Sequence, residues 1–489
     1  MQAAYAKAAI LPKPVLVWFR RDLRLADNPA LAAAAASGRP ILPIYVHDEM
    51  TPGIRPLGGA GRWWLHHSLA VLAGGIARLG SRLVLRRGPA ADVLSDVVRQ
   101  SGADRAYWNR LDDPSAAGRD RATERALKER GVAVESFNAS LLVEPDKIAT
   151  RSGRPFSVFT PFWKALQDAV APAPPLPAPR SLPGHDVPVA GDALDDWRLL
   201  PRNPDWAAGF LPLWQPGEDG ARRRFAAFRD GPLAAYAARH DNPGAAGTSR
   251  LSPHIHFGEM GPRQIWHATA FGLERTGDAG MAFLRQIGWR EFNRHLLLHH
   301  PEMVTRNVNA AFDAFPWRND AAGLAAWQRG ETGYPIVDAG MRELWRTGWM
   351  HNRVRMIAAS FLVKHMLIDW RQGEAWFWDT LVDADTANNA GNWQWVAGSG
   401  FDAAPYFRIF NPMLQGERFD AGGAYVRRWV PEIARLPDRY LHRPWEAPAD
   451  VLADAGVRLG DSYPAPIVDH KQARQRALDA YAAIKNLRG

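Results

Sequence analysis

The sequence contains no cysteine and no long apolar run, and each absence excludes a class of protein. Without cysteine, the chain of 489 residues has no disulfide, thiolate-bound zinc, iron–sulfur cluster or cysteine nucleophile. No stretch approaches the run of about 18 apolar residues that a membrane span needs, and Met1 to Pro14 lacks a secretory pattern. We therefore expect a cytoplasmic protein with no membrane partner, in which redox chemistry would need a bound cofactor.

Positive charge and tryptophan are both abundant. The formal net charge is +9 and there are 21 tryptophans. An excess of positive charge favours a polyanionic partner, with nucleic acid ahead of an anionic membrane. Most tryptophans should pack in a core, while others could stack on flat rings. The hydrophobic content of 47% is that of a globular protein long enough for two or three domains.

The front of the chain alternates short β-rich runs with helical stretches. The expected strands are residues 15–19, 41–46, 83–85, 106–108 and 132–137. The expected helices are residues 29–37, 62–79, 91–100 and 119–130. This alternation predicts a doubly wound, Rossmann-like parallel sheet with helices on both faces. Ligands of such sheets lie beyond the carboxyl ends of the strands.

Prolines crowd together between residues 171 and 204, which indicates a linker. After it, strand signals almost vanish and amphipathic patterns predict helices. These patterns cover residues 222–240, 262–275, 281–300, 341–370 and 374–381. The sequence therefore divides into an α/β domain at 14–142, a proline-rich linker at 143–215 and an all-helical domain at 216–489.

Residues 345–412 place Arg, Asn and Asp side chains among many large apolar ones. Buried charged and amide groups need partners, so they suit a polar ligand better than they fill space. Asn352 and Arg355 lie three residues apart on adjoining helix faces. If Arg355 is withdrawn from water, Asp383 or Asp385 could supply the opposite charge. A solvated arginine on a helix surface is the alternative.

Several shorter patterns have two interpretations. The hydroxyls, arginine and backbone N–H groups of residues 248–253 suit a phosphate, although an ordinary helix N-cap is equally compatible. Gln286, Trp289, Arg290 and Asn293 share one helical face, where a surface ion pair is the simpler interpretation.

Two patterns resemble parts of metal sites. The pair His254 and His256 has no third ligand nearby in the sequence. Asp383 and Asp385 resemble the start of a calcium loop, but its glycine and closing glutamate are missing. We therefore expect no metal.

Five long motifs are spread over nearly the whole chain. They are Trp18-Phe19-Arg20-Arg21-Asp22-Leu23-Arg24-Leu25-Ala26-Asp27-Asn28-Pro29, Gly247-Thr248-Ser249-Arg250-Leu251-Ser252-Pro253, Trp289-Arg290-Glu291-Phe292, Gly348 to Met356 and Asn388 to Trp395. With them the chain resembles the cryptochrome/photolyase family, most closely the bacterial class I cyclobutane pyrimidine dimer (CPD) photolyases. The resemblance extends to the run from Asp402 to Pro412. It implies an α/β antenna domain followed by a helical domain that binds a bent FAD.

The resemblance also implies roles for individual residues. Those implied to hold FAD are Tyr236, Thr248, Ser249, Arg250, Leu251, Ser252, Arg290, Asn352, Arg355, Asp383, Ala384, Asp385 and Asn389. Those implied to contact the lesion or adjacent DNA are Gln286, Trp289, Asn293, Asn352, Arg353, Met356, Trp395 and Gln415. Arg355 would pair with Asp383, and Asn389 would face the flavin N5. Trp393, Trp370 and Trp317 would form an electron-transfer chain to the surface.

The implied activity is light-dependent DNA repair by a deoxyribodipyrimidine photo-lyase. Reduced FAD would absorb light and pass an electron to a flipped-out dimer, whose cyclobutane bonds then open. UV-damaged DNA would be the partner of a monomeric enzyme, and a damaged pair costs less to flip than a sound one. A second, antenna chromophore is also implied, with methenyltetrahydrofolate the leading candidate. His47, Arg62, Trp108 and Asn109 lie near its expected cleft.

Two departures from the pattern leave alternatives open. CPD photolyases usually carry Glu where this chain has Gln286, and Gln is familiar from the (6-4) photolyase branch. His240 stands where an Arg usually precedes Asp241. Gln286 leaves a (6-4) photolyase as an alternative, and a cryptochrome photosensor is the alternative from another functional class. Asn352 follows His351 where the (6-4) branch carries a catalytic pair of histidines, and this difference favours the CPD as the lesion. The sequence after the helical domain is short, which favours repair over signalling.

Overall fold

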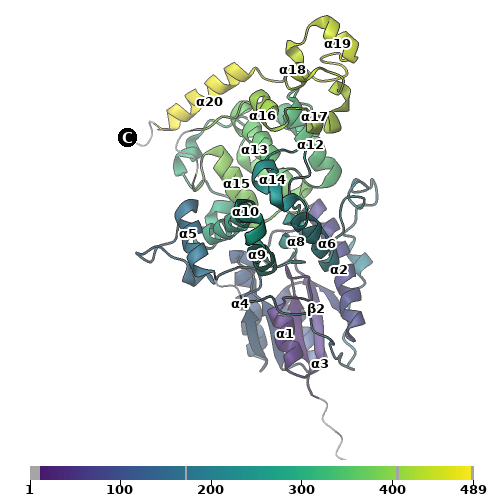
Figure 1. The fold of residues 1–489 in the computed structure, drawn as a ribbon. Helices are drawn as coiled ribbons and strands as arrows, with labels where there is room; N and C mark the ends of the chain where they lie inside the picture. The colour runs from purple at the N-terminus through teal and green to yellow at the C-terminus, as the bar shows by residue number, and fades with distance from the viewer. Residues whose placement is uncertain (1–11, 171–172, 403–406, 486–489) are drawn as a thin grey trace, which may run out of the picture.

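The fold has an α/β half, at the bottom of Figure 1, and a helical half, at the top. The computed structural model describes residues 12–170, 173–402 and 407–485. Parts of the N-terminal stretch, of the proline-rich run and of the run from Asp402 to Pro412 lie outside the described residues.

The α/β half is built on a five-stranded parallel sheet with the strand order β3-β2-β1-β4-β5. The strands are β1 (Val15–Phe19), β2 (Ile41–His47), β3 (Val84–Arg87), β4 (Arg105–Asn109) and β5 (Ala133–Phe137). The helices between them are α1 (Pro29–Ala36), α2 (Gly59–Arg78), α3 (Ala90–Ser101) and α4 (Pro114–Lys128). The predicted doubly wound sheet is confirmed.

The central strands β1 and β4 bring two polar loops to one edge of the sheet. Both are almost entirely buried because helices cover both faces, which explains their apolar composition. Since neighbouring parallel strands end at the same edge, residues 20–28 and 110–113 emerge together. This edge faces the helical half, and Arg24 donates a hydrogen bond across it to the carbonyl of Gly258 at 2.9 Å.

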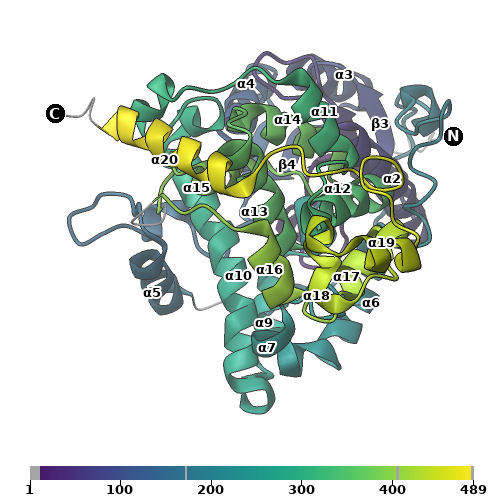
Figure 2. The same ribbon diagram turned by 90° about the horizontal axis from the view of Figure 1, so that it is seen from above.

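The other half is helical, as expected. Its helices are α5 (Phe159–Ala169), α6 (Glu218–Arg229), α7 (Tyr236–Arg239), α8 (Ser252–His256), α9 (Pro262–Ala270), α10 (Leu273–His299), α11 (Ala321–Arg329), α12 (Pro335–Thr347), α13 (Asn352–Ser360), α14 (Trp370–Thr380), α15 (Thr386–Ala397), α16 (Pro412–Phe419), α17 (Ala424–Trp429), α18 (Asp438–Leu441), α19 (Ala449–Ala455) and α20 (His470–Lys485). Seen from above, α10 runs through the middle of this half beside α15, and α20 lies along one side (Figure 2).

The prediction of a single long helix over residues 341–370 is wrong. Helix α12 ends at Gly348, whose φ of 67° is a left-handed conformation that suits glycine. His351 then caps α13, since its side chain accepts a hydrogen bond from the N–H of Arg353. A π-helical turn at Phe361–His365 follows, and Asp369 caps α14. The apolar periodicity was continuous, but caps and a left-handed glycine divide it into separate helices.

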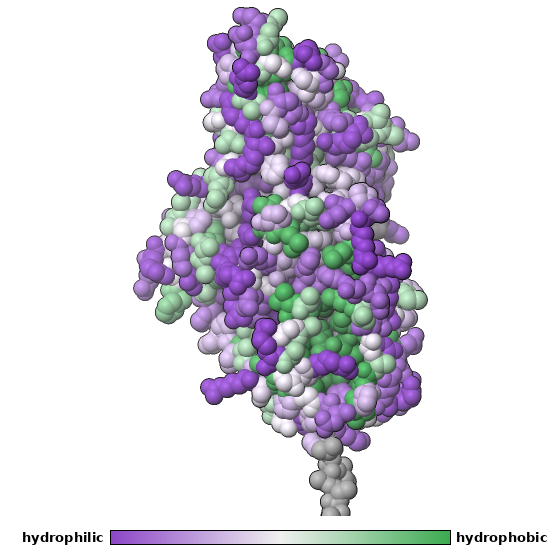
Figure 3. All heavy atoms as spheres, turned by 90° about the vertical axis from the view of Figure 1, so that its right-hand side faces the viewer, coloured by the Kyte–Doolittle hydropathy of each residue, from purple (hydrophilic) through white to green (hydrophobic). Residues whose placement is uncertain are grey.

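The surface differs between the two halves. On the face seen in Figure 3, polar residues dominate the helical half and apolar residues gather mainly over the α/β half. In the part of the chain that the structure describes, no helix combines the length and apolar character of a membrane span.

Candidate functional site

A large cavity opens into the helical half. Its volume of about 530 Å³ lies within the roughly 300–1,000 Å³ of a small-ligand pocket. Its walls come from α7, the turn before α8, α10, α13, α14 and α15. The size suits a large ligand.

The cavity collects almost all of the residues singled out from the sequence. Every residue implied to hold FAD lines it, as do all the implied lesion contacts except Gln415. Trp393 lines it too, whereas Trp370 and Trp317 lie outside its lining. Segments more than 150 residues apart in sequence therefore meet at one place.

Arg355 forms a bidentate ion pair with Asp383 on one wall. Its two terminal nitrogens lie 3.1 and 2.9 Å from the carboxylate oxygens, and Nε donates to the carbonyl of Met350 at 2.8 Å. The Asp383 side chain is only 3% exposed. Since a buried carboxylate needs a partner, the pair resolves the choice between a buried and a solvated Arg355.

Asn389 is fastened by a relay that begins in the α/β half. Its side-chain N–H₂ donates to the carboxylate of Glu374 at 2.8 Å and to the Glu374 carbonyl at 3.0 Å. Glu374 in turn accepts two hydrogen bonds from Arg55, at 2.7 and 3.0 Å. Because both amide protons are taken, Oδ1 is the atom that Asn389 has left to offer a ligand, as an acceptor.

Asp385 lies in a second relay between the halves. Its Oδ2 accepts a hydrogen bond from Arg294 at 3.0 Å, and Arg294 also binds Asp112 of the α/β half. Burial alone would raise the pKa of Asp385, but the charge of Arg294 and the contacts with His256 and Arg21 together outweigh it and hold the pKa well below its usual value. Burial lowers the pKa of nearby His256. Asp385 is therefore an anion held beside a neutral histidine.

The turn of residues 248–252 is braced from behind. Arg250 has a left-handed φ of 51°, which is uncommon outside glycine. Its guanidinium lies 4.7 Å from the ring centre of Trp349 and 3.8 Å from the buried carboxylate of Glu343. Trp349 also donates to Ser252 Oγ at 3.2 Å. These contacts hold a strained turn whose hydroxyls and N–H groups line the cavity.

Two half-buried indoles, Trp289 and Trp395, line the cavity. Trp289 stacks on Phe159 of α5 with ring centres 3.7 Å apart and planes within 7°. Trp395 donates from Nε1 to the carbonyl of Asp402 at 2.9 Å. Each ring is fixed by a contact outside the cavity, so both are held in place before a ligand enters. Flat rings held in this way suit stacking on bases.

Positive charge at the mouth is partly balanced by acidic groups. Arg353 makes two hydrogen bonds to Asp241, at 3.3 and 2.7 Å, and lies over the ring of Phe419. His240 stacks on Tyr236 at 4.8 Å. Arg353 is 20% exposed in its side chain, so it stays accessible to an anion such as a DNA phosphate.

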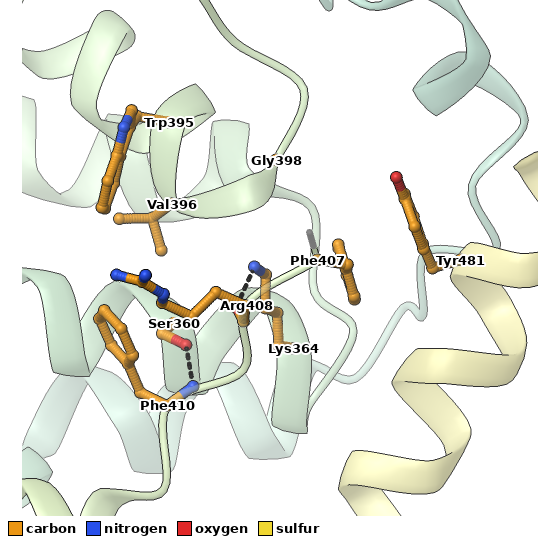
Figure 4. Close-up of a pocket in the computed structure, with 9 residues that line it drawn as sticks. All are labelled: Ser360, Lys364, Trp395, Val396, Gly398, Phe407, Arg408, Phe410 and Tyr481. Carbon is orange, nitrogen blue, oxygen red and sulfur yellow. Dashed lines mark hydrogen bonds between the residues drawn. The ribbon is translucent and has the colours of Figure 1, made fainter. Parts of the chain in front are cut away.

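A smaller hollow of about 30 Å³ adjoins the cavity and shares Trp395 and Val396 with it. Figure 4 shows Lys364 with its ammonium directed at the backbone carbonyl of Arg408. The ammonium also lies 4.2 Å from the ring centre of Phe407. Burial lowers the pKa of Lys364 to about 7. Lys364 therefore fastens the segment beside the Trp395 wall.

Trp393 sits between the cavity and the core. A Cβ atom on Gly373 would lie 2.1 Å from its ring, so only glycine allows this approach. Its other ring neighbours are Phe377 at 5.0 Å and Trp327 at 6.2 Å. Trp370 donates from Nε1 to Asn307 at 2.9 Å. The electron-transfer chain from Trp393 through Trp370 to the surface remains a prediction.

Sequence reasoning missed several residues of the site. Arg294 follows Arg290 by four residues, so helical spacing could have placed it on the same face. Glu374, Arg55 and Phe159 carried no comparable signal, because their roles arise only from tertiary contacts.

Most of the residues expected near an antenna cleft are buried or bonded to other residues of the protein. His47, Trp108 and Asn109 are each at most 3% exposed. His47 stacks on Trp197 at 5.1 Å, and Asn109 donates to Asp22 and Asn28. Arg62 pairs with Glu49. An open chromophore cleft needs accessible side chains, so three of the four are unsuited to line one.

The metal patterns are explained by internal contacts. His254 bonds to Glu259, while His256 faces Asp385. Among the described residues, no group of three or more His, Asp or Glu side chains could hold a metal ion.

The lining fits a flavin dinucleotide. It offers hydroxyls and N–H groups for phosphates, and Arg290 as a cation. Burial lowers the pKa of Arg290 to about 10, so it stays protonated at neutral pH. Three buried donors or acceptors in the lining, His256 Nδ1, Arg294 Nε and Trp393 Nε1, have no hydrogen-bond partner within the described part of the chain. Unpaired buried polar atoms are rare unless a ligand meets them.

Comparison with known proteins agrees with this site. The family model of the FAD binding domain of DNA photolyase matches residues 283–483, and that of DNA photolyase matches residues 15–180. A deoxyribodipyrimidine photo-lyase of Agrobacterium fabrum is 53% identical over 474 residues, covering 96% of this chain and 98% of the relative. Cryptochrome-1 of Arabidopsis thaliana is 40% identical over 484 residues, covering 96% of this chain and 70% of the relative.

A solved structure is similar over its whole length. The crystal structure of a bacterial class III photolyase from Agrobacterium tumefaciens has a TM-score of 0.96 and 52% identity, covering 99% of this chain and 100% of that chain. The expectation of a class I enzyme is therefore not supported, since the motifs that suggested it are compatible with a relative of another class.

Proposed function

Because the chain belongs to the DNA photolyase/cryptochrome family and carries its FAD-binding domain, we propose that it is a class III photolyase that repairs cyclobutane pyrimidine dimers in light. The observation that carries the proposal is one cavity with two kinds of wall. Paired charges and a phosphate-suited turn line one part of it, and two indoles, each held by a contact outside the cavity, line another. Bound FAD would supply light absorption and a transferable electron.

The protein's own part is to bind, orient and exclude water. Arg355 with Asp383, Asp385 with Arg294, and Asn389 with Glu374 are polar groups fixed before any ligand arrives. Preorganised groups need little rearrangement when charge moves in the site. Trp289 and Trp395 would hold the flipped-out bases in contact with the cofactor.

The lining supports the CPD over the (6-4) lesion. His240 and His256 are the histidines in the lining, and Asn352 and Met356 occupy the wall at the mouth. His351 is 3% exposed and serves as a helix cap. The resemblance ties (6-4) repair to catalytic histidines, which this wall lacks within the described residues. Gln286 lines the cavity as an amide donor and acceptor.

A cryptochrome photosensor is the second candidate, favoured by the 40% identity to Cryptochrome-1 of Arabidopsis thaliana. The greater identity to a photo-lyase and the two indoles that line the cavity support repair instead. We further propose a monomer in the cytoplasm, with the domain division at 14–142, 143–215 and 216–489. The second chromophore, with methenyltetrahydrofolate as candidate, also remains a proposal.

Illumination of the reduced, FAD-loaded protein tests the proposal. Oligonucleotides that carry a CPD or a (6-4) lesion are incubated with it in blue light or darkness, and lesions are counted by chromatography. We expect loss of the CPD in light only. Binding without repair would favour the photosensor, and loss of the (6-4) lesion alone would reverse the lesion assignment.

A variant pair ties the activity to the cavity. Trp289→Ala should weaken binding of CPD-containing DNA by about 1–3 kcal/mol, the cost of losing one base–aromatic stack, while FAD stays bound. Phe271→Ala removes an aromatic ring that is 87% exposed and outside the cavity, so it should change neither property.

A further inference from the structure

Arg294 joins the two halves of the protein at the back of the cavity. It projects from α10 with one terminal nitrogen on Asp112 and the other 3.0 Å from Asp385 Oδ2. The side chains of Asp112, Arg294 and Asp385 are 11%, 9% and 6% exposed. One buried cation is therefore shared between a carboxylate of the α/β half and a carboxylate of the cavity wall.

Asp112 is held in this position from its own side. It follows β4 on the loop at the sheet edge that faces the helical half. Ser140 donates its hydroxyl to both carboxylate oxygens, at 3.2 and 3.0 Å. The carboxylate therefore has fixed partners on two sides, and its charge stays beside Arg294.

Asp385 is equally fixed, which lets a change at Asp112 reach the cavity. Its Oδ1 accepts from the N–H and the side-chain amide of Asn388, at 3.0 and 2.9 Å. Its Oδ2 faces Arg294 and, at 3.8 Å, His256. Burial would lower the pKa of Arg294, but the charges of Asp385 and Asp112 outweigh it and raise the pKa. Both carboxylates thus contribute to one charge balance.

We propose that Asp112 of the α/β half is a positioning residue of the flavin site, which acts through Arg294 and Asp385 to set how strongly the site favours the reduced, anionic flavin. The inference rests on the proposed function, in which the cavity holds FAD. A residue of the α/β half would thereby influence the midpoint potential of the cofactor. Buried charges interact strongly because little water screens them.

The sign of the effect follows from the charge count. Asp112→Asn removes one negative charge and leaves Arg294 more positive toward the cavity, so the anionic reduced flavin gains stability and the midpoint potential rises. Arg294→Gln removes the positive charge and leaves two carboxylates unbalanced, so the potential falls. A general disturbance of the fold would not be expected to shift the midpoint potentials of the two variants in opposite directions.

The test is the midpoint potential of flavin bound to the full chain, followed by absorbance during reductive titration. Asp104→Asn is the matched control, because Asp104 belongs to the same half but pairs with Arg39 on a partly exposed surface. We expect a higher potential for Asp112→Asn, a lower one for Arg294→Gln and no change for the control. Asp112→Glu keeps the charge and should return the potential toward that of the wild type.

The outcomes separate this inference from the proposed function. Flavin content of the wild type is measured first, and a wild type without flavin would overturn the proposed function. If the wild type holds flavin but Asp112→Asn and Arg294→Gln shift the potential in the same direction or not at all, the inference alone is overturned. Melting temperatures of the flavin-free variants show whether each has folded, and Asp112→Glu supplies the comparison if Arg294→Gln has not.

Discussion

Arg355→Met offers a quantitative check on the buried ion pair of the cavity. The change removes two hydrogen bonds to Asp383 and one to the Met350 carbonyl, and it leaves the Asp383 carboxylate buried without its cation. Breaking a buried pair by removing one partner costs about 3–5 kcal/mol. The Arg355 side chain is 24% exposed, so water can partly reach the gap. We expect a loss at the lower end, about 3 kcal/mol.

The assay is urea unfolding of the flavin-free protein in a double-mutant cycle with Asp383→Asn. Each single variant leaves the other member of the pair without its partner, whereas the double variant removes both. The double variant should therefore be more stable than the sum of the two losses predicts, by at least about 1 kcal/mol. Arg329→Met is the control, since its pair with Glu331 is largely exposed and should contribute under about 1 kcal/mol. Strictly additive losses, or a cost for Arg355→Met as small as that of the control, would refute the reasoning.

The remaining predictions concern light, pH and salt. Trp393→Phe should block photoreduction of oxidised FAD, because phenylalanine is far harder to oxidise than an indole; an unchanged photoreduction rate would remove Trp393 from the pathway. Burial lowers the pKa of His351 to about 4 from an ordinary 6.5, so the stability it contributes is present above pH 6.5 and is lost as the pH falls toward 4. His351→Asn keeps a capping side chain and should lose less stability than the wild type between pH 7 and pH 5, as urea unfolding at each pH would reveal. Arg353→Gln should reduce the slope of log binding constant against log salt by up to about 0.9 for CPD-containing DNA, the value for one phosphate contact. An unaltered slope would mean that Arg353 contacts no phosphate.

Local patterns were sufficient to predict the sheet and the helical half. The strands of the α/β half are short apolar runs separated by helical stretches, and each formed close to the expected bounds. The helix expected over residues 341–370 failed because apolar periodicity continued through Gly348, where the backbone turns to a left-handed conformation. Periodicity reports which face is buried, and it does not report where capping groups end a helix.

Only the residues of the candidate site that lie within the sequence motifs were predicted. The Arg355–Asp383 pair was implied by the family resemblance, whereas the residues alone left Asp383 and Asp385 both open as partners of Arg355. The relays through Arg294 to Asp112 and through Glu374 to Arg55 could not, because each depends on how the two halves dock. The Phe159 support of Trp289 comes from a segment expected to be linker, where composition gave no sign of a buried aromatic contact.

The central claim is that one cavity holds the cofactor and the lesion in contact. Titration of the FAD-loaded protein with CPD-containing DNA, followed by the absorption spectrum of the flavin, tests it most directly. We predict a saturable spectral change with the damaged oligonucleotide and none with the same undamaged sequence. If damaged DNA binds and the flavin spectrum stays the same, or if both oligonucleotides change it alike, the lesion does not enter the flavin cavity.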